Sequence, residues 1–317
     1  MTAPSGRTVK VLVPDDLGVK VLETATDLEA IRYEPGQPWP AGHADATVVV
    51  VGYESAAAVG ARFVELPDLR LVQTLNAGYD QWLPHLPDGV MLSNARGAHG
   101  GSSAEWVVAA LLAIYRDLPF FSEQQSKGIW QPKVTETLIG KRVVVLGAGD
   151  LAVNLASRLA PFDADVALVG RRARPGVHAY DAVERLLPRA DVVVSMLPAD
   201  ASTYHIIDAE FLAALRDGAV VVNVGRGAAV DTEALLAELN AGRLRAALDV
   251  TDPEPLPKDH PLWSAPGLLL TPHVGGSTSG AWDRAWAIAL RQISVYADGG
   301  VPENLVAGPG TPARNLR

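Results

Sequence analysis

Three short segments in the second half of the chain carry polar residues of the kinds that move protons and hold anions. They read Asn-Val-Gly-Arg-Gly at 223–227, Asp-Val-Thr-Asp-Pro-Glu-Pro at 249–255 and Thr-Pro-His-Val-Gly-Gly at 271–276. Each follows a short apolar run that is typical of a buried strand. Because the carboxyl ends of parallel strands meet at one edge of a sheet, we expect Arg226, Glu254 and His273 to lie close together.

These three side chains match what the reduction of a 2-oxo acid requires from a protein when a cofactor provides the hydride. His273 can give a proton to the carbonyl oxygen near neutral pH, and as neutral imidazole it can act as the base in the reverse reaction. Glu254 would orient the ring and stabilise its protonated form. Arg226 would hold the substrate carboxylate in a planar fork and polarise the carbonyl.

Each of the three residues also has an ordinary structural role open to it. His273 could cap a strand end, Glu254 could be a turn residue between prolines, and Arg226 could form a surface ion pair. Their joint occurrence after three successive strands favours the catalytic interpretation. Asp231 precedes a helical run, so we interpret it as a helix N-cap and not as a catalyst.

A glycine-rich turn lies upstream, between an apolar run at 142–146 and an amphipathic helical pattern. It reads Gly-Ala-Gly-Asp-Leu-Ala at 147–152, a GxGxxA pattern. The first glycine permits the tight turn, the second lets the backbone approach a pyrophosphate, and the small third residue allows close packing of helix on strand. Free N–H groups at the helix start favour an anion there. We therefore predict a dinucleotide site that uses Gly147, Gly149, Asp150 and Leu151.

The loop after the next expected strand indicates which dinucleotide is bound. An NAD-specific site normally places a carboxylate there for the ribose 2′-hydroxyl. This chain instead has Gly170, Arg171 and Arg172, with a further arginine at 174. Guanidinium groups bind a 2′-phosphate through charge-assisted hydrogen bonds, whereas a carboxylate would repel it. We predict that NADP(H) is preferred and NAD(H) possible; the alternative is that these are solvated surface arginines.

The elements that must position these residues form two series, as expected for two domains in 317 residues. Apolar runs occur at 9–13, 30–33, 47–51, 71–75 and 90–93, and then at 142–146, 165–169, 191–196, 219–223, 245–250 and 268–271. Helical stretches separate them, so we predict an α/β fold with parallel sheets covered by helices. Apolar spacing also predicts a buried connector helix at 103–118 and a final helix at 280–297 that returns to the first domain.

Composition excludes several classes of function. The net charge of −9 and the pI near 5.3 make a nucleic-acid or anionic-membrane partner unexpected. Without cysteine the chain has no disulfide, thiol nucleophile or cysteine-ligated metal, and we expect no metal site. No apolar run approaches the length of a membrane span and the chain enters a strand pattern almost at once, so we expect a cytoplasmic protein.

Taken together, the glycine loop and the three polar segments resemble the D-isomer-specific 2-hydroxyacid dehydrogenase family. The residues of these motifs are most similar to those of its glyoxylate and hydroxypyruvate reductases. The resemblance extends to NAGYD at 76–80 and to SNARG at 93–97, which AEW follows at 104–106. It implies two doubly wound parallel-sheet domains, in which a Rossmann cofactor domain at 99–280 is inserted into a flavodoxin-like substrate domain at 1–98 and 281–317. It also implies that Arg226, Glu254 and His273 are catalytic. Ala152 departs from the family's third loop glycine.

The resemblance implies further site residues and an assembly. Asn76 and the backbone N–H groups around Ala77 and Gly78 would bind the substrate carboxylate together with Arg226, and Asp249 would meet the nicotinamide carboxamide. The remaining residues that we assign to the dinucleotide site are Leu197, Pro198, Val224, Gly225, His273 and Gly275. A homodimer would form through the helix near Ser103 and an arm that includes Trp130.

Other functions on the same scaffold stay open at this point. A dinucleotide-sensing corepressor would use the fold to regulate partners without turnover. A phosphite or phosphonate-linked dehydrogenase would use the same cleft, and a 3-phosphoglycerate dehydrogenase is a further alternative. The phosphoglycerate enzyme would need additional basic residues near the substrate loop, for which Arg96 is the one obvious candidate. The intact Arg226, Glu254 and His273 set favours an enzyme over the sensing protein.

Overall fold

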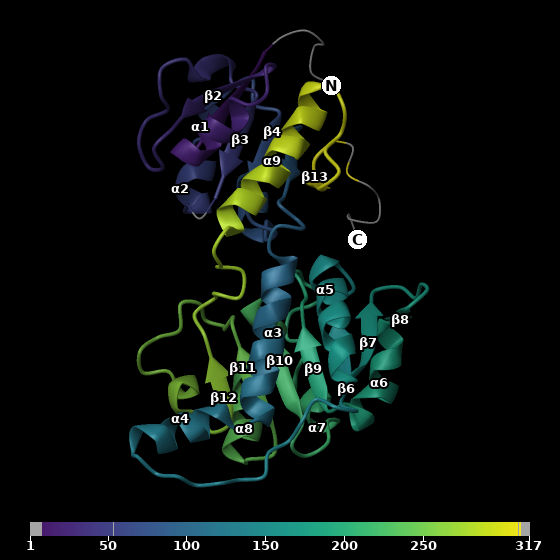
Figure 1. Cartoon of the computed structure of the whole chain (residues 1–317). Helices are drawn as coiled ribbons and strands as arrows, with labels where there is room; N and C mark the ends of the chain where they lie inside the picture. Colours follow the sequence, from purple (N-terminus) through teal and green to yellow (C-terminus); the bar gives the residue numbers. More distant parts are fainter. Residues whose placement is uncertain (1–7, 53, 310, 312–317) are drawn as a thin grey trace. The chain divides into compact units, whose positions relative to one another are not determined.

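The computed structural model describes residues 8–52, 54–309 and 311 of the 317-residue chain. The chain divides into two compact units (Figure 1). The terminal unit contains both chain ends, Met1–His99 and Ser279–Arg317, and the inserted unit is Gly100–Thr278. Each unit is built on a twisted sheet with helices on both faces. The predicted α/β class with two doubly wound sheets is therefore confirmed.

The sheet of the terminal unit has the strand order β13-β5-β4-β3-β1-β2, in which all neighbours pair in parallel except β13 and β5. The strands are β1 Val9–Val13, β2 Leu28–Arg32, β3 Val48–Val51, β4 Leu71–Thr74, β5 Met91–Ser93 and β13 Leu305–Ala307. The return strand β13 was not predicted. Its antiparallel pairing with β5 extends the sheet with a segment from the far end of the sequence.

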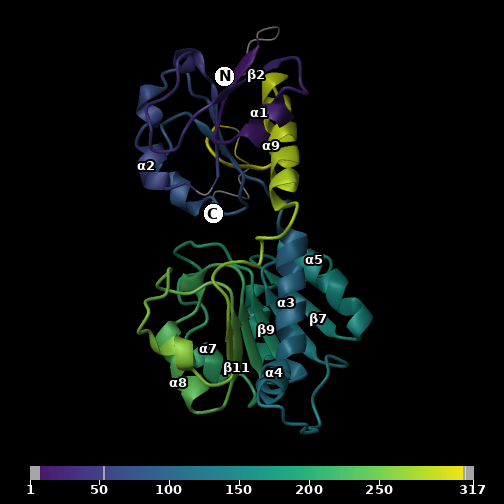
Figure 2. The same ribbon diagram turned by 60° about the vertical axis from the view of Figure 1, so that its left-hand side comes forward.

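Helices α1 (Asp16–Leu22) and α9 (Ala281–Ala297) lie side by side on one face of this sheet, and α2 (Ala56–Gly60) lies on the other (Figures 1 and 2). Trp286, Ala289 and Ile293 of α9 are fully buried against this face of the sheet. Burial of an aliphatic or aromatic side chain of this size contributes about 1.5–3 kcal/mol. Helix α9 therefore belongs to the core of the terminal unit.

The sheet of the inserted unit is parallel throughout, with the order β12-β11-β10-β9-β6-β7-β8. Its strands are β6 Arg142–Leu146, β7 Asp165–Gly170, β8 Val177–Ala179, β9 Val192–Ser195, β10 Val220–Asn223, β11 Arg245–Leu248 and β12 Leu268–Leu270. The order reverses between β6 and β9, and such a switch point opens a crevice at the carboxyl ends of the strands. Only the short edge strand β8 had no counterpart in the sequence prediction.

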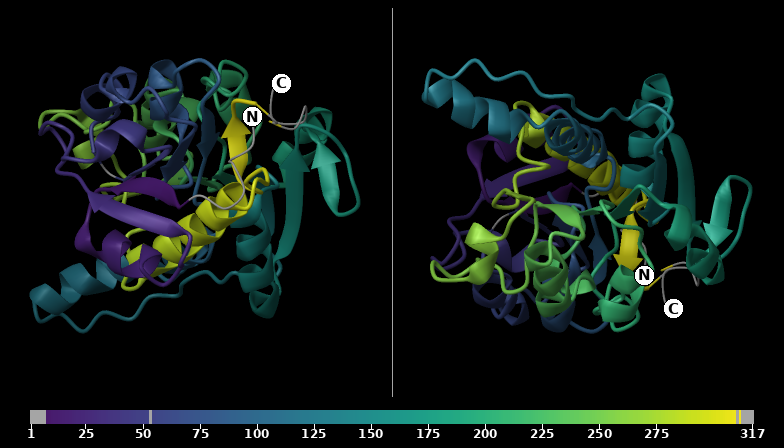
Figure 3. Two further views of the ribbon diagram at one scale, coloured as in Figure 1. Left: turned by 90° about the horizontal axis from the view of Figure 1, so that it is seen from above. Right: turned by 90° about the horizontal axis from the view of Figure 1, so that it is seen from below.

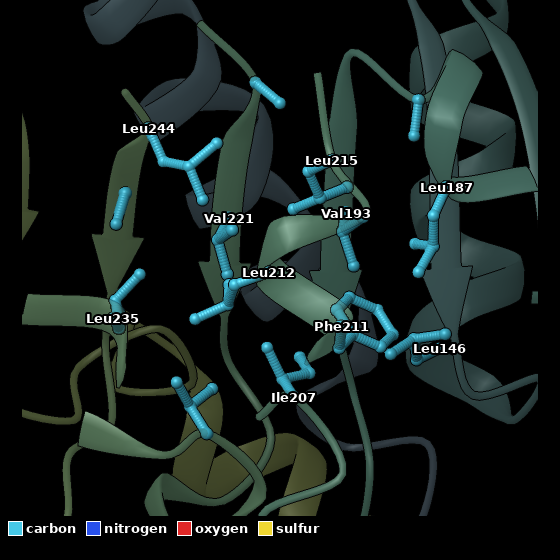
Figure 4. Close-up of a cluster of buried hydrophobic side chains, with 14 of the residues drawn as sticks. Leu146, Leu187, Val193, Ile207, Phe211, Leu212, Leu215, Val221, Leu235 and Leu244 are labelled. Atoms are coloured by element: carbon cyan, nitrogen blue, oxygen red, sulfur yellow. The ribbon is translucent and has the colours of Figure 1, made fainter. Parts of the chain in front are cut away.

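Helices cover both faces of this sheet, as Figure 2 shows for α3 and α5 on one side and α7 and α8 on the other. The helices are α3 Gly100–Tyr115, α4 Leu118–Ser126, α5 Asp150–Leu159, α6 Val183–Leu186, α7 Ala209–Ala213 and α8 Thr232–Asn240. Strands that are buried on both faces need no polar alternation, which explains the Val-Val-Val runs of β6, β9 and β10. On the α7 and α8 side, Phe211, Leu212 and Leu235 pack with Val193 and Val221 of the sheet (Figure 4).

The predicted helix at 103–118 differs from the observed one at both ends. Helix α3 begins at Gly100 and ends at Tyr115, and a separate helix, α4, begins at Leu118. Asp117 between them has a left-handed backbone with φ of 50°, and Pro119 has no N–H with which to continue the α3 hydrogen bonds. After α4 the chain is without helix or strand until β6 (Figure 3), and Trp130 and Val134 on this stretch are each 97% exposed.

Within the described ranges, no helix combines the length and apolar character that crossing a bilayer requires. The same residues contain no group of three His, Asp or Glu side chains arranged to hold a metal ion.

Candidate active site

His273 and Glu254 are in direct contact in the inserted unit. The Nδ1 atom of His273 lies 2.7 Å from Oε1 of Glu254. The glutamate follows β11 and the histidine follows β12, and these strands are neighbours in the sheet. When Nδ1–H donates to the carboxylate, Nε2 is the ring nitrogen that remains for proton exchange with another group. Both side chains are about half exposed, so a small molecule can approach the ring.

The backbone that presents His273 is held by Asp249. His273 has a φ of 54°, and its N–H donates to the Asp249 carbonyl at 2.7 Å. The Asp249 side chain is 2% exposed and accepts bonds from the Thr271 hydroxyl at 2.6 Å and from the N–H groups of Val274 and Gly275, both at 2.8 Å. A left-handed backbone costs about 1–3 kcal/mol in a non-glycine residue, and these bonds offset it. Asp249 thus orients the His273 loop, and its role toward a nicotinamide stays a prediction.

Arg226 lies in the loop after β10, the next strand of the sheet, and is partly buried. Asn223 supports this loop in two directions. Its Nδ2 donates to the Arg226 carbonyl at 2.9 Å, and its Oδ1 accepts from the Gly225 N–H at 3.2 Å. The Arg226 guanidinium donates through Nη1 to the Gly225 carbonyl at 3.0 Å. The structure therefore places Arg226, Glu254 and His273 after three adjacent strands at one sheet edge.

The glycines that flank Arg226 allow its loop to touch both neighbours. A Cβ on Gly225 would lie 2.6 Å from the carbonyl oxygen of Leu197 in the loop after β9. A Cβ on Gly227 would lie 1.9 Å from the carbonyl oxygen of Thr251 in the loop after β11. Since both obstacles are backbone atoms, no side-chain rotation can make room for a larger residue.

Gly227→Ala should therefore destabilise the folded protein by about 3 kcal/mol or more, because backbone segments must separate to admit the methyl group. Urea unfolding followed by circular dichroism would measure this. The matched control is Gly149→Ala, because a Cβ on Gly149 would meet no atom within 4 Å. An unfolding midpoint of Gly227→Ala equal to that of the control would contradict the close packing of the two loops.

The glycine loop has the features that a dinucleotide needs. Gly147 has a φ of 117°, and a Cβ there would lie 3.1 Å from the Met196 carbonyl oxygen. Gly149 is the N-cap of α5, has no side-chain cap and faces open space. Ala152 is 1% exposed and belongs to the buried cluster that α5 forms with the sheet, as expected for the small third residue of the GxGxxA pattern. An uncapped helix start beside open space fits a pyrophosphate.

Asp150 and Leu151 are the first two residues of α5. The Asp150 carboxylate is turned toward the start of α3, because a Cβ on Gly100 would lie 1.9 Å from its Oδ2. Its Oδ1 accepts from Asn154 Nδ2 at 3.1 Å. A carboxylate that faced a bound pyrophosphate would repel it. The Asp150 carboxylate instead packs against the start of α3.

The arginine loop after β7 is in contact with the glycine loop. Gly170 ends β7, and a Cβ there would lie 3.4 Å from that of Ala148. Arg174 donates through Nη2 to the Ala148 carbonyl at 2.6 Å. Arg171 forms an ion pair with Asp200, which lies in the loop after β9. Asp200 was missed from the sequence, where nothing marks it as a partner of a residue 29 positions away.

The other residues assigned to the dinucleotide lie at the same sheet edge. Leu197 and Pro198 follow β9, Val224 and Gly225 follow β10, Asp249 follows β11, and Gly275 follows β12. The Thr203 hydroxyl donates to the Pro198 carbonyl at 2.7 Å and so fixes the loop after β9.

The predicted substrate loop at 76–78 belongs to the terminal unit. Asn76 donates through Nδ2 to the Gly52 carbonyl at 3.2 Å, and Asn94 donates to the Ala77 carbonyl at 2.7 Å. In the part of the chain that the structure describes, the N–H groups of Ala77 and Gly78 have no intramolecular acceptor. Two such donors on a braced loop fit an anion.

Comparison with known proteins points to one family. The family model described as D-isomer specific 2-hydroxyacid dehydrogenase, NAD binding domain, matches residues 108–275. Glyoxylate/hydroxypyruvate reductase B of Yersinia pestis is 31% identical over 260 residues, which cover 77% of this chain and 79% of the relative. D-3-phosphoglycerate dehydrogenase of Methanocaldococcus jannaschii is 30% identical over 323 positions, which cover 97% of this chain and 61% of the relative.

A solved structure agrees in fold. The D-isomer specific 2-hydroxyacid dehydrogenase from Xanthobacter autotrophicus, in complex with NADPH and MES, has a TM-score of 0.83 at 29% identity and covers 95% of this chain and 98% of its own. These matches confirm the resemblance that the sequence motifs indicated.

Proposed function

The chain belongs to the D-isomer specific 2-hydroxyacid dehydrogenase family, and from this premise we propose that it reduces a small 2-oxo acid such as glyoxylate or hydroxypyruvate. The family makes it an NAD(P)-dependent oxidoreductase. The observation that carries the proposal is the 2.7 Å contact between His273 Nδ1 and Glu254 Oε1, which leaves Nε2 for proton exchange. Yersinia pestis glyoxylate/hydroxypyruvate reductase B supports the choice of substrate.

A bound nicotinamide dinucleotide would supply the hydride for C2 of the substrate. His273 Nε2 gives its proton to the carbonyl oxygen as that oxygen becomes an alkoxide. Glu254 stabilises the imidazolium form and keeps the ring oriented before the transfer. Arg226 binds the substrate carboxylate through its planar guanidinium. In the oxidation direction neutral His273 takes the proton from the hydroxyl.

NADP(H) is the dinucleotide that we propose as preferred, with NAD(H) as the second choice. Gly147, Gly149 and the start of α5 would hold the pyrophosphate, and Arg171 and Arg172 lie after β7, where the adenosine ribose binds in this fold. The Xanthobacter relative was solved with NADPH. Guanidinium groups suit a 2′-phosphate because they remain charged and donate in pairs.

A 3-phosphoglycerate dehydrogenase is the second candidate because of the Methanocaldococcus relative. Its substrate would need a basic side chain for the phosphate. Arg96, the one candidate that we identified in the sequence, donates through Nη2 to Asn304 Oδ1 at 2.9 Å and to the Glu303 carbonyl at 3.2 Å. Because the Arg96 guanidinium is hydrogen-bonded to residues of the terminal unit, we favour the substrates without a phosphate.

Steady-state assays with glyoxylate, hydroxypyruvate and 3-phosphohydroxypyruvate, each with NADPH and NADH, test the proposal. We expect turnover of the first two that is faster with NADPH, because Arg171 and Arg172 follow β7, the strand at whose end this fold binds the adenosine ribose. Turnover with 3-phosphohydroxypyruvate alone would favour the second candidate. Tight dinucleotide binding without turnover of any 2-oxo acid would favour a dinucleotide-sensing binding protein.

We also propose a cytoplasmic homodimer. The exposed apolar side chains of Trp130 and Val134 on the stretch after α4 support an interface there. Light scattering that finds only monomers would contradict the dimer.

A further inference from the structure

An ion pair connects the loop after β7 with the loop after β9. These two strands flank β6, which leads into the glycine loop. The guanidinium of Arg171, the residue directly after β7, pairs through Nη2 with Oδ2 of Asp200, in the loop after β9. Strands β7 and β9 lie on opposite sides of β6 in the sheet. The pair therefore bridges the switch point of the inserted unit.

The position of this pair relative to the glycine loop defines which part of a dinucleotide it would meet. Gly170 lies against Ala148 on one side, and Gly147 lies against Met196, at the start of the β9 loop, on the other. A dinucleotide whose pyrophosphate is held at Gly149 extends its adenosine ribose toward the end of the second strand, which here is β7. The Arg171–Asp200 pair thus lies at the ribose end.

Asp200 is fixed in its ionised form. Its Oδ1 accepts from the Ser202 N–H at 2.8 Å and from the Ser202 hydroxyl at 2.5 Å, while its own N–H donates to Thr203 Oγ1 at 3.0 Å. Partial burial alone would raise the pKa of Asp200, but the Ser202 bonds and the Arg171 charge lower it below the usual value for a carboxyl. A negative charge therefore stays in this loop throughout the neutral range.

The three arginines after β7 are not equivalent. Arg174 is bonded to the Ala148 carbonyl, and Arg171 is paired with Asp200. Arg172 is exposed and has no carboxylate partner among residues 8–52, 54–309 and 311. A 2′-phosphate that approaches Arg171 would have to share that guanidinium with Asp200 and would meet a like charge beside it. The 2′-hydroxyl of NAD(H) carries no charge and escapes this repulsion.

We propose that Asp200 determines how strongly this enzyme prefers NADPH over NADH, because its carboxylate holds Arg171 and opposes the 2′-phosphate. The inference rests on the proposed use of NADP(H) and names the residue that limits it. Asp200 acts as a specificity-determining residue, and it takes no part in the chemistry at C2. The arginines attract the 2′-phosphate, and Asp200 reduces that attraction to a moderate preference.

The test is Asp200→Asn, studied by the nicotinamide fluorescence of bound NADPH and NADH, which needs no turnover. Asparagine keeps an Oδ1 that accepts from Ser202, so the turn is retained while the charge is removed. We expect the Kd for NADPH to fall by about tenfold and the Kd for NADH to change by less than about twofold. The gain for NADPH should shrink at high ionic strength, because the exposed charges are then screened.

The charge-matched control is Asp217→Asn. Asp217 is exposed, lies at the amino end of β10 and pairs with Arg243, so it changes the net charge by the same amount away from the site. It should leave both Kd values unchanged. Equal shifts for NADPH and NADH in Asp200→Asn, or no shift in either, would overturn the proposal. If the unaltered enzyme binds neither dinucleotide, the proposed function fails together with this inference, whereas an unchanged preference in an active Asp200→Asn enzyme contradicts only the role of Asp200.

Discussion

Replacement of His273 by asparagine should lower kcat for glyoxylate reduction by about a thousandfold, because the transition state loses its proton donor. Asparagine is the appropriate substitute, since it tolerates the left-handed backbone that His273 adopts at φ 54°. The Kd for NADPH should change far less than kcat, because Asp249 continues to hold the backbone of the loop through bonds to Thr271, Val274 and Gly275. Stopped-flow or steady-state absorbance would measure kcat, and fluorescence would measure the Kd.

A substitution at Glu254 tests whether the His273–Glu254 contact serves catalysis or is purely structural. Glu254→Gln keeps a hydrogen-bond acceptor but removes the charge that stabilises imidazolium, so the decline in kcat should be smaller, about 10–100-fold. The control is Glu233→Gln, an exposed glutamate in the first turn of α8. A His273→Asn enzyme whose kcat equals that of the unaltered enzyme would contradict the assignment of His273 as the proton donor.

Arg226→Lys should lower kcat/KM for glyoxylate by about 100-fold or more, although the positive charge is kept. The lysine ammonium cannot form the paired, planar hydrogen bonds that a guanidinium makes with a carboxylate. An aldehyde without a carboxylate, glycolaldehyde, should be reduced slowly by both proteins and should be much less sensitive to the substitution. This contrast identifies binding of the substrate carboxylate as the lost function.

A matched control for Arg226→Lys is Arg216→Lys. Arg216 pairs with Asp191, which precedes β9 and so lies at the amino end of the sheet. It should retain full kcat/KM. A loss of activity with glycolaldehyde as large as that with glyoxylate would contradict the role of Arg226 toward the carboxylate.

Local sequence patterns were sufficient to predict much of the fold. The buried runs of β6, β9 and β10 consist of valines because helices cover both faces, and such runs are visible without any knowledge of contacts. Asp231 was expected to be an N-cap, and its side chain does accept from the Ala234 N–H at 3.1 Å. Where the pattern was weak the prediction was incomplete, since three-residue strands such as β8 and β13 carry too few residues to show a periodicity.

The contacts between distant loops could not be predicted in the same way. The pairing of Arg171 with Asp200 and the turn of Asp150 toward Gly100 depend on how separate loops fold over a sheet edge. For Asp249, the family resemblance implied only a contact with the nicotinamide carboxamide, which stays a prediction. The structure shows in addition that its carboxylate organises the His273 loop, a role that depends on distances of 2.6–2.8 Å between residues more than 20 positions apart.

In the proposed reaction a bound nicotinamide dinucleotide supplies a hydride to C2 of a small 2-oxo acid, and His273 supplies the proton. The most direct test is to incubate the enzyme and hydroxypyruvate with NADPH that carries deuterium at the transferable C4 position, and to examine the product by mass spectrometry and chiral separation. The account predicts D-glycerate with one deuterium at C2, and no such product with His273→Asn on the same timescale. Unlabelled glycerate, or no reduction of hydroxypyruvate or glyoxylate by a protein that binds NADPH, would contradict it.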